Sequence, residues 1–207
     1  MDFRTAIKIE PEKPAVDYNS KLFLLGSCFV ENIAGKLDWY KLQYLGNPFG
    51  ILYHPYSIEN FLKKVASGYE YTAEDILFFN EKWISLEAHS HLSKNSKEDL
   101  LKELNEKISL TGNYIKESSH CFITLGTSWF YRNNDSGLPV ANCHKIPQKK
   151  FTKELTGVDE MRHIIKNIIS AIRSVNPSTT IIFTISPVRH LKEGMVENQR
   201  SKAILLS

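Results

Sequence analysis

Two residues that can act as nucleophiles stand side by side near the start of the chain. Ser27 and Cys28 come directly after an apolar run, residues 22–25, and the turn residue Gly26. A segment typical of a helix, residues 30–39, follows them. A buried strand that turns tightly into a helix places its turn residues at the carboxyl edge of a sheet, where open α/β folds bind ligands. Because the N-terminus of the helix also favours negative charge, we take this turn as the candidate active site.

Cys28 is the stronger candidate nucleophile of the two. One residue separates it from Gly26, so it reaches the first turn of the predicted helix, where backbone N–H groups and the helix dipole stabilise a thiolate. The alternative interpretation is structural, with Cys28 packed in the core and Ser27 capping the helix. Spacing alone leaves both interpretations open, because small residues are common in any turn from strand to helix.

Polar residues that follow the other predicted strands supply partners for such a nucleophile. Acyl transfer needs a nucleophile, a general base and hydrogen-bond donors for the oxyanion. Because parallel strands share one carboxyl edge, we expect the residues after each strand to converge there. His190 is the candidate base; the alternative is a plain surface histidine beside Arg189. The candidate substrate and oxyanion residues are Gly26, Asn47, Gly126, Thr127, Ser128, Asn142, His144 and Arg189.

Two further groups of residues carry side chains that can bind ligands. His89 and His91, with Glu87, carry metal-binding atoms, but no further ligand motif accompanies them, so no metal site is assigned. The lysines between residues 145 and 153 can meet an anionic substrate, although a solvated basic loop is the commoner explanation. No cofactor is expected.

The composition is that of an ordinary globular protein able to bury a core. At 207 residues, with 42% hydrophobic and 24% charged residues, the chain fits one domain or one domain with a modest insertion. A net charge of +3 carries no implication of nucleic acid or an anionic membrane. No apolar run approaches the roughly 20 residues needed to span a bilayer, and residues 1–19 lack a signal-peptide core. Three cysteines argue against a disulfide framework and favour a cytoplasmic location.

Short apolar strands alternate with long amphipathic helices, and this alternation predicts the fold. It is typical of a parallel sheet with helices on both faces, a three-layer α/β/α sandwich of flavodoxin-like type. Ser57 is the expected cap of the second helix. Strands are predicted at 21–25, 40–45, 121–125 and 180–185, and helices at 30–39, from 57, at 96–114, 159–175 and 194–207.

The expected domain spans residues 21–207, after an extension at 1–20 and with a small inserted hairpin region at about 69–93. The region from 133 to 153 is expected to form polar and basic loops. Flavodoxin-like sheets usually have about five strands in the order 2-1-3-4-5. With fewer strands in the pattern, we expect a sheet that is incomplete at its C-terminal end.

These motifs resemble those of the GSCFA-domain family. The family takes its name from its N-terminal motif, which residues 26–29 reproduce here, with Val30 in place of the final alanine. Further matching stretches are 47–50, 126–129, 142–145 with 147–148, 186–190 and 197–202. The family looks related to the SGNH (GDSL-like) hydrolases, which are flavodoxin-like serine esterases and acyl hydrolases. The resemblance implies a reaction class and no substrate.

The resemblance also implies roles for the two candidate nucleophiles. Aligned with the Gly-Asp-Ser turn of SGNH enzymes, Ser27 stands at the aspartate and Cys28 at the serine, and some relatives use cysteine there. The SGNH base lies in an Asp-x-x-His motif that the sequence up to Ser207 does not contain. We expect a truncated chain; otherwise His190 substitutes or the chain is inactive.

The resulting hypothesis is a hydrolase or acyltransferase acting on a small-molecule ester or an acylated carbohydrate. The alternative is a non-catalytic α/β binding module.

Overall fold

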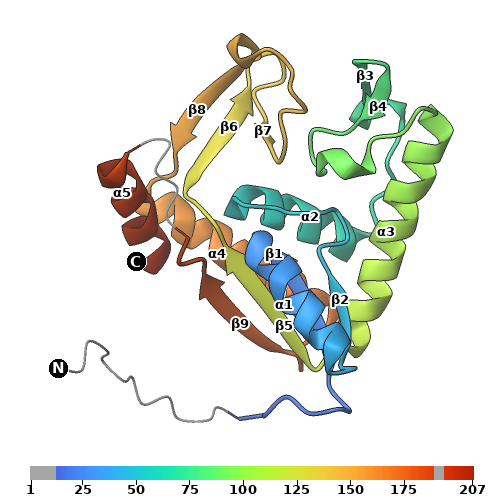
Figure 1. Cartoon of the computed structure of the whole chain (residues 1–207), viewed down its shortest axis with the longest axis vertical. Coiled ribbons are helices and arrows are strands. Elements are labelled where there is room, and N and C mark those ends of the chain that lie inside the picture. Colours follow the sequence, from blue (N-terminus) through green and yellow to red (C-terminus); the bar gives the residue numbers. More distant parts are fainter. Residues whose placement is uncertain (1–12, 189–193) are drawn as a thin grey trace.

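A parallel sheet of four strands forms the centre of the molecule (Figure 1). The computed structural model describes residues 13–188 and 194–207. The strands β1 (Lys21–Gly26), β2 (Gln43–Gly46), β5 (His120–Leu125) and β9 (Thr180–Ile185) lie in the order β2-β1-β5-β9. All three neighbouring pairs are parallel. Counted along the chain this order is 2-1-3-4, as in the first four strands of a flavodoxin-like sheet, which confirms the predicted α/β class.

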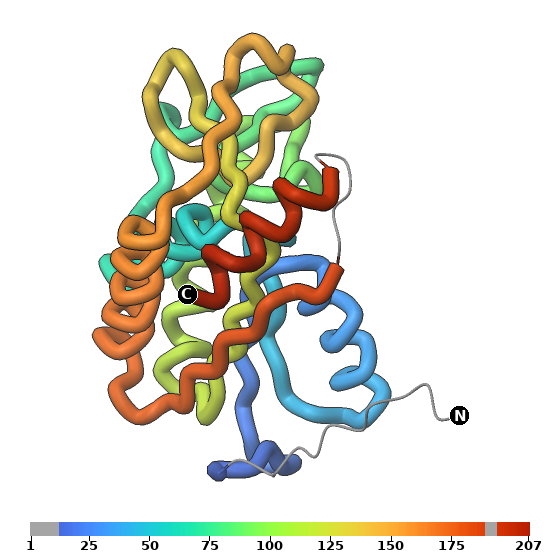
Figure 2. The backbone as a smooth tube through the Cα atoms, turned by 90° about the vertical axis from the view of Figure 1, so that its left-hand side faces the viewer, coloured from blue at the N-terminus to red at the C-terminus, as the bar shows by residue number. Residues whose placement is uncertain are grey.

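Helices cover both faces of this sheet, because alternate side chains of β1 point in opposite directions. Leu22 and Leu24 pack with Val30 of α1 (Cys28–Trp39) on one face. Phe23 and Leu25 belong to the larger core on the other face. There they meet α2 (Pro55–Ser67), α3 (Lys97–Glu117) and α4 (Val158–Val175), while α5 (Met195–Leu206) lies beside α4 and β9. Figure 2 shows α1 on the opposite side of the sheet from α3 and α4.

Two small antiparallel sheets lie at the end of the molecule toward which the central strands run (Figure 1). One is the hairpin of β3 (Leu77–Phe79) and β4 (Lys82–Ile84). The other has the order β7-β6-β8 and is built from β6 (Trp129–Asn133), β7 (Pro139–Val140) and β8 (Phe151–Leu155). The sequence pattern predicted loops for most of this second sheet, which was wrong. Its strands are short and mix apolar residues with partly buried polar ones, so their apolar alternation is weak.

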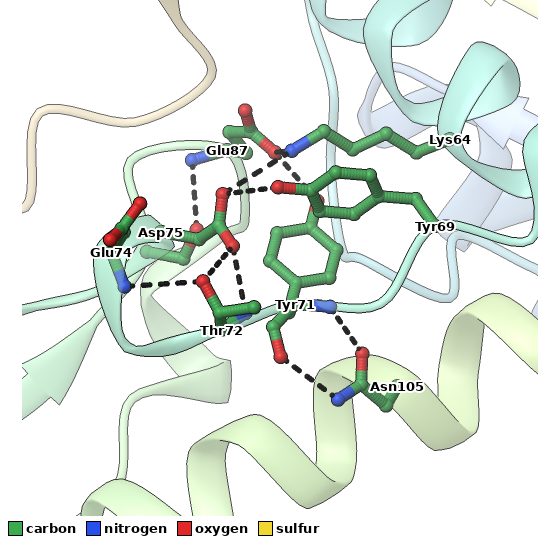
Figure 3. A network of polar contacts seen from close by, with 9 residues as sticks. Lys64, Tyr69, Tyr71, Thr72, Glu74, Asp75, Glu87 and Asn105 are labelled. Atoms are coloured by element: carbon green, nitrogen blue, oxygen red, sulfur yellow. Dashed lines mark hydrogen bonds and ion pairs between the residues drawn. The ribbon is translucent and has the colours of Figure 1, made fainter.

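A polar network holds the segment 69–93 against α2 and α3 (Figure 3). The Nζ of Lys64 and the hydroxyl of Tyr71 both donate to Oε2 of Glu87, at 2.6 Å each. Asn105 of α3 accepts the Tyr71 backbone N–H at 2.7 Å and donates to the Tyr71 carbonyl at 3.2 Å. The network fixes the position of the Glu87 carboxylate.

The second helix begins earlier than the sequence pattern predicts. Its N-cap is His54, not Ser57, and Pro55 occupies the first helical position. The Nδ1 atom of His54 accepts the backbone N–H of Tyr56 at 3.0 Å. Proline suits this position because its missing N–H has no partner inside a helix anyway.

Among the described residues, no helix combines the length and the apolar character that crossing a membrane requires.

Gly26 ends β1 in a conformation that only glycine adopts readily, which gives a test of the turn. Its φ is +136°, and a Cβ atom would lie 2.1 Å from the carbonyl oxygen of Thr124. We expect Gly26→Ala to lower the free energy of unfolding by about 3 kcal/mol or more. Urea denaturation measures this change.

The matched control is Gly35→Ala, inside α1, where an added Cβ has no neighbour within 4 Å. It should raise stability by about 0.5–1 kcal/mol. A Gly26→Ala protein as stable as the native chain would contradict the close approach of β1 and β5.

Candidate active site at the carboxyl edge of the sheet

The turn after β1 buries Ser27 and presents Cys28. Ser27 is 1% exposed and caps α1: its Oγ accepts the N–H of Phe29 at 3.4 Å, and its carbonyl accepts that of Val30 at 2.9 Å. The capping role considered for Ser27 is therefore confirmed. Cys28 is half-buried at the first helical position. Its backbone N–H has no acceptor among the described residues, as expected for a first-turn amide.

Asn47 supports the turn from the neighbouring loop. Its Oδ1 accepts the backbone N–H of Gly26 at 2.8 Å, and its Nδ2 donates to Oε1 of Glu31 at 2.7 Å. The side chain is 6% exposed. Asn47 was predicted as a substrate or oxyanion residue, and the structure places it under the turn, where it fixes the path of the backbone that carries Cys28.

A cleft of about 660 Å³ is lined by residues that follow β5 and precede α2, and neither Ser27 nor Cys28 is part of its lining. Tyr53 lines the cleft. Burial raises the pKa of Tyr53, and the charge of Cys28 raises it further, so the thiol lies within electrostatic range of the cleft wall. Of the residues predicted from the sequence, Thr127 and Asn142 also line the cleft. Its volume lies within the roughly 300–1,000 Å³ typical of small-molecule sites.

Asn142 and His144 differ in how they are engaged. The Oδ1 of Asn142 accepts the N–H of His144 at 2.8 Å, and its Nδ2 has no partner in the described part of the chain. The Nε2 of His144 lies 2.8 Å from the carbonyl oxygen of Ser85 and 3.0 Å from that of Ala88, so Nε2 carries the proton. Burial lowers the pKa of His144. Asn142 can thus donate into the cleft, while neutral His144 ties its loop to the segment 69–93.

The turn after β5 is held by α5. The Oγ of Ser201 accepts the backbone N–H of Ser128, and the Ser128 hydroxyl donates to the Ser201 carbonyl, both at 2.8 Å. The Ser201 Oγ also lies 3.1 Å from Oγ1 of Thr127. Lys202 donates from Nζ to the carbonyl of Gly126 at 2.7 Å, and burial lowers the pKa of this lysine. Two of the sequence motifs, 126–129 and 197–202, are therefore in direct contact.

This contact predicts that Ser201 stabilises the turn. Ser201→Ala removes the acceptor for the buried N–H of Ser128, which should lower the free energy of unfolding by about 1–3 kcal/mol. Ser109→Ala, on the exposed side of α3, is the matched control and should change it by less than about 0.5 kcal/mol. Thermal or urea unfolding compares the two; equal effects would contradict the assignment.

His54 is a buried residue of the cleft wall that sequence reasoning missed as a functional residue. It is 4% exposed and lines the cleft. Its Nδ1 accepts the Tyr56 N–H, and its Nε2 lies 2.9 Å from Oγ1 of Thr156, so Nε2 carries the proton. Burial lowers the pKa of His54 to about 3. The only signal in the sequence was a histidine directly before a proline at a helix start.

The depressed pKa of His54 predicts acid sensitivity of the fold. Below the unfolded-state pKa of about 6.5, the unfolded chain gains a proton that the native state does not. The unfolding free energy should therefore fall by up to about 1.4 kcal/mol per pH unit as the pH decreases from 6.5. The loss should continue toward the native pKa of about 3.

Urea denaturation at pH 7.0, 6.0 and 5.0 measures this slope. His54→Asn retains a capping side chain and removes the titrating group, so its slope should be shallower. A variant with the native slope would show that another group is responsible.

The remaining predicted residues do not supply a base within the described structure. Arg189 and His190 lie outside the described residues. His89 and His91 face each other, with their Nδ1 atoms 2.9 Å apart. Within residues 13–188 and 194–207, no group of three or more His, Cys, Asp or Glu side chains is arranged to hold a metal ion.

Comparison with known families assigns the chain. The sequence profile of the GSCFA family matches residues 21–207. The chain belongs to the GSCFA family. No curated protein and no solved structure matches it. In this GSCFA domain, the motif at 26–29 lies on the turn after β1, supported by Asn47 of the motif at 47–50, and the motif at 126–129 begins directly after β5 on the neighbouring strand.

Proposed function

We propose that this GSCFA domain is an acyl-ester hydrolase or acyltransferase of the SGNH type, with Cys28 as the nucleophile. One observation carries the proposal: a half-buried thiol stands at the first position of α1, close enough to Tyr53 of the cleft wall for its charge to raise the pKa of that residue. Ser27 is the weaker nucleophile because its hydroxyl is buried and accepts a backbone N–H.

The reaction would proceed through a thioester. The Sγ of Cys28 attacks the carbonyl carbon of the bound ester, and the carbonyl oxygen becomes an oxyanion. The free backbone N–H of Cys28 and the Nδ2 group of Asn142 are the proposed donors to this oxyanion. The C–O bond then breaks, and the alcohol leaves with a proton. Water, or an acceptor hydroxyl, attacks the thioester and regenerates the thiol. His190 stays the candidate base for these proton transfers.

The substrate belongs to this proposal as well. The cleft combines aromatic rings with polar groups, which suits a small-molecule ester or an acylated carbohydrate. A cytoplasmic setting fits because Cys28, Cys121 and Cys143 are all free thiols.

Hydrolysis of p-nitrophenyl acetate by the chain and two variants tests the nucleophile. Cys28→Ala should lower kcat by at least about a hundredfold. Ser27→Ala keeps the thiol and removes only a helix cap. Its free energy of unfolding should fall by about 1 kcal/mol, while most of the activity remains. Cys28→Ser is the conservative variant and should retain more activity than Cys28→Ala.

Four outcomes separate the hypotheses. Loss of activity in Ser27→Ala alone would move the nucleophile to Ser27. Equal activity in all variants would favour a non-catalytic binding module. Trapping of the acetylated enzyme supports the proposal if the acetyl group is found on Cys28. Cys143 also lines the cleft, and burial raises the pKa of its thiol; an acetyl group found only on Cys143 would overturn the proposal.

A further inference from the structure

A second hollow adjoins the cleft. It has a volume of about 240 Å³ and lies between the start of α2 and β7. Ser57 and Ala141 line both the cleft and the hollow, so the two are neighbours along one groove. A volume below the roughly 300 Å³ at which small-molecule sites begin marks the hollow as an extension of the cleft and not as a separate site.

The hollow presents polar groups that no protein partner engages. Asn60 and Ser57 line it, and their side chains have no hydrogen-bond partner among the described residues. Glu87 also lines it and accepts from Lys64 and Tyr71 through Oε2 alone. Figure 3 shows its other carboxylate oxygen pointing away from these two partners. An amide, a hydroxyl and a fixed carboxylate oxygen together both donate and accept hydrogen bonds, as ligand hydroxyls require.

The lining disfavours two other kinds of extended ligand. An aliphatic acyl chain would cover the Asn60 amide, the Ser57 hydroxyl and the second carboxylate oxygen of Glu87 without giving them a hydrogen-bond partner, which is unfavourable. A peptide adding to the edge of β7 would find no free backbone donors: Pro139 has no N–H, and Ala141 already donates to Leu86.

The cleft itself is lined by aromatic side chains. Trp129 and Tyr131 are two residues apart in β6, so their side chains lie on the same side of that strand, and both line the cleft. The Nζ of Lys153 lies 5.0 Å from the Trp129 ring centre and 6.0 Å from that of Tyr131. A sugar ring has C–H faces that pack on aromatic rings and hydroxyls around its rim, so it matches the cleft and the hollow together.

We propose that the groove binds an oligosaccharide, with one sugar against Trp129 and Tyr131 and the next in the hollow at Ser57, Asn60 and Glu87. The sugar against Trp129 and Tyr131 would be the acylated one, and this assignment rests on the proposed function. The binding of the saccharide does not, and the two are tested separately.

Binding is measured with the Cys28→Ala chain by isothermal titration calorimetry. The probes are unacylated cello-, xylo-, manno- and chitotetraose and the corresponding monosaccharides. At least one tetrasaccharide should bind at least tenfold more tightly than its monosaccharide. Asn60→Ala should weaken that tetrasaccharide about three- to tenfold, the effect of one lost hydrogen bond. Asn113→Ala makes the same change on the exposed side of α3 and should leave the Kd unchanged.

The proposal is overturned if no tetrasaccharide binds, if tetrasaccharide and monosaccharide bind equally, or if Asn60→Ala and Asn113→Ala behave alike. Tighter binding of an acetylated tetrapeptide than of every saccharide would also overturn it. Saccharide binding without hydrolysis of p-nitrophenyl acetate would remove the proposed function and leave the groove assignment standing. Hydrolysis without saccharide binding would do the reverse.

Discussion

The close approach of two backbones, at Gly26 and Thr124, is the constraint on which the candidate site depends. The N–H of Ser27 donates to the carbonyl of Thr124 at 3.1 Å, and no space remains for a side chain at Gly26. Asn47 holds the preceding peptide, because its Oδ1 accepts the N–H of Gly26. Because β1 is fixed by these contacts at its last residue, α1 must begin directly after it, and the thiol of Cys28 is presented at the start of that helix. The turn is thus determined by backbone packing between neighbouring strands.

The central strands and the helices could be predicted from the sequence because their signal is local. Runs such as 22–25 and 181–183 are apolar without interruption, as strands covered on both faces require, and the helices carry periodic apolar stripes. The same local pattern identified the strand–turn–helix at Gly26. Their order in the sheet followed from general rules of connection and was not encoded in any single segment.

What could not be predicted depends on contacts between distant residues. The β6–β8 pairing joins Arg132 to Glu154 across the strands, and neither residue looks like part of a sheet in isolation. His54 caps α2 because Thr156, a hundred and two positions away, holds its other nitrogen. Likewise, the motif at 197–202 was recognisable in the sequence, but its reason is tertiary: Ser201 and Lys202 satisfy the backbone of the turn after β5.

The neutral imidazole of His54 has a further consequence for the cleft. With its pKa near 3 and both nitrogens engaged, the His54 side chain does not change its charge between mildly acidic and mildly alkaline solution. The electrostatic potential that His54 contributes to a bound ligand is therefore constant over that range. Any proton uptake that accompanies ligand binding there must therefore involve groups other than this buried histidine.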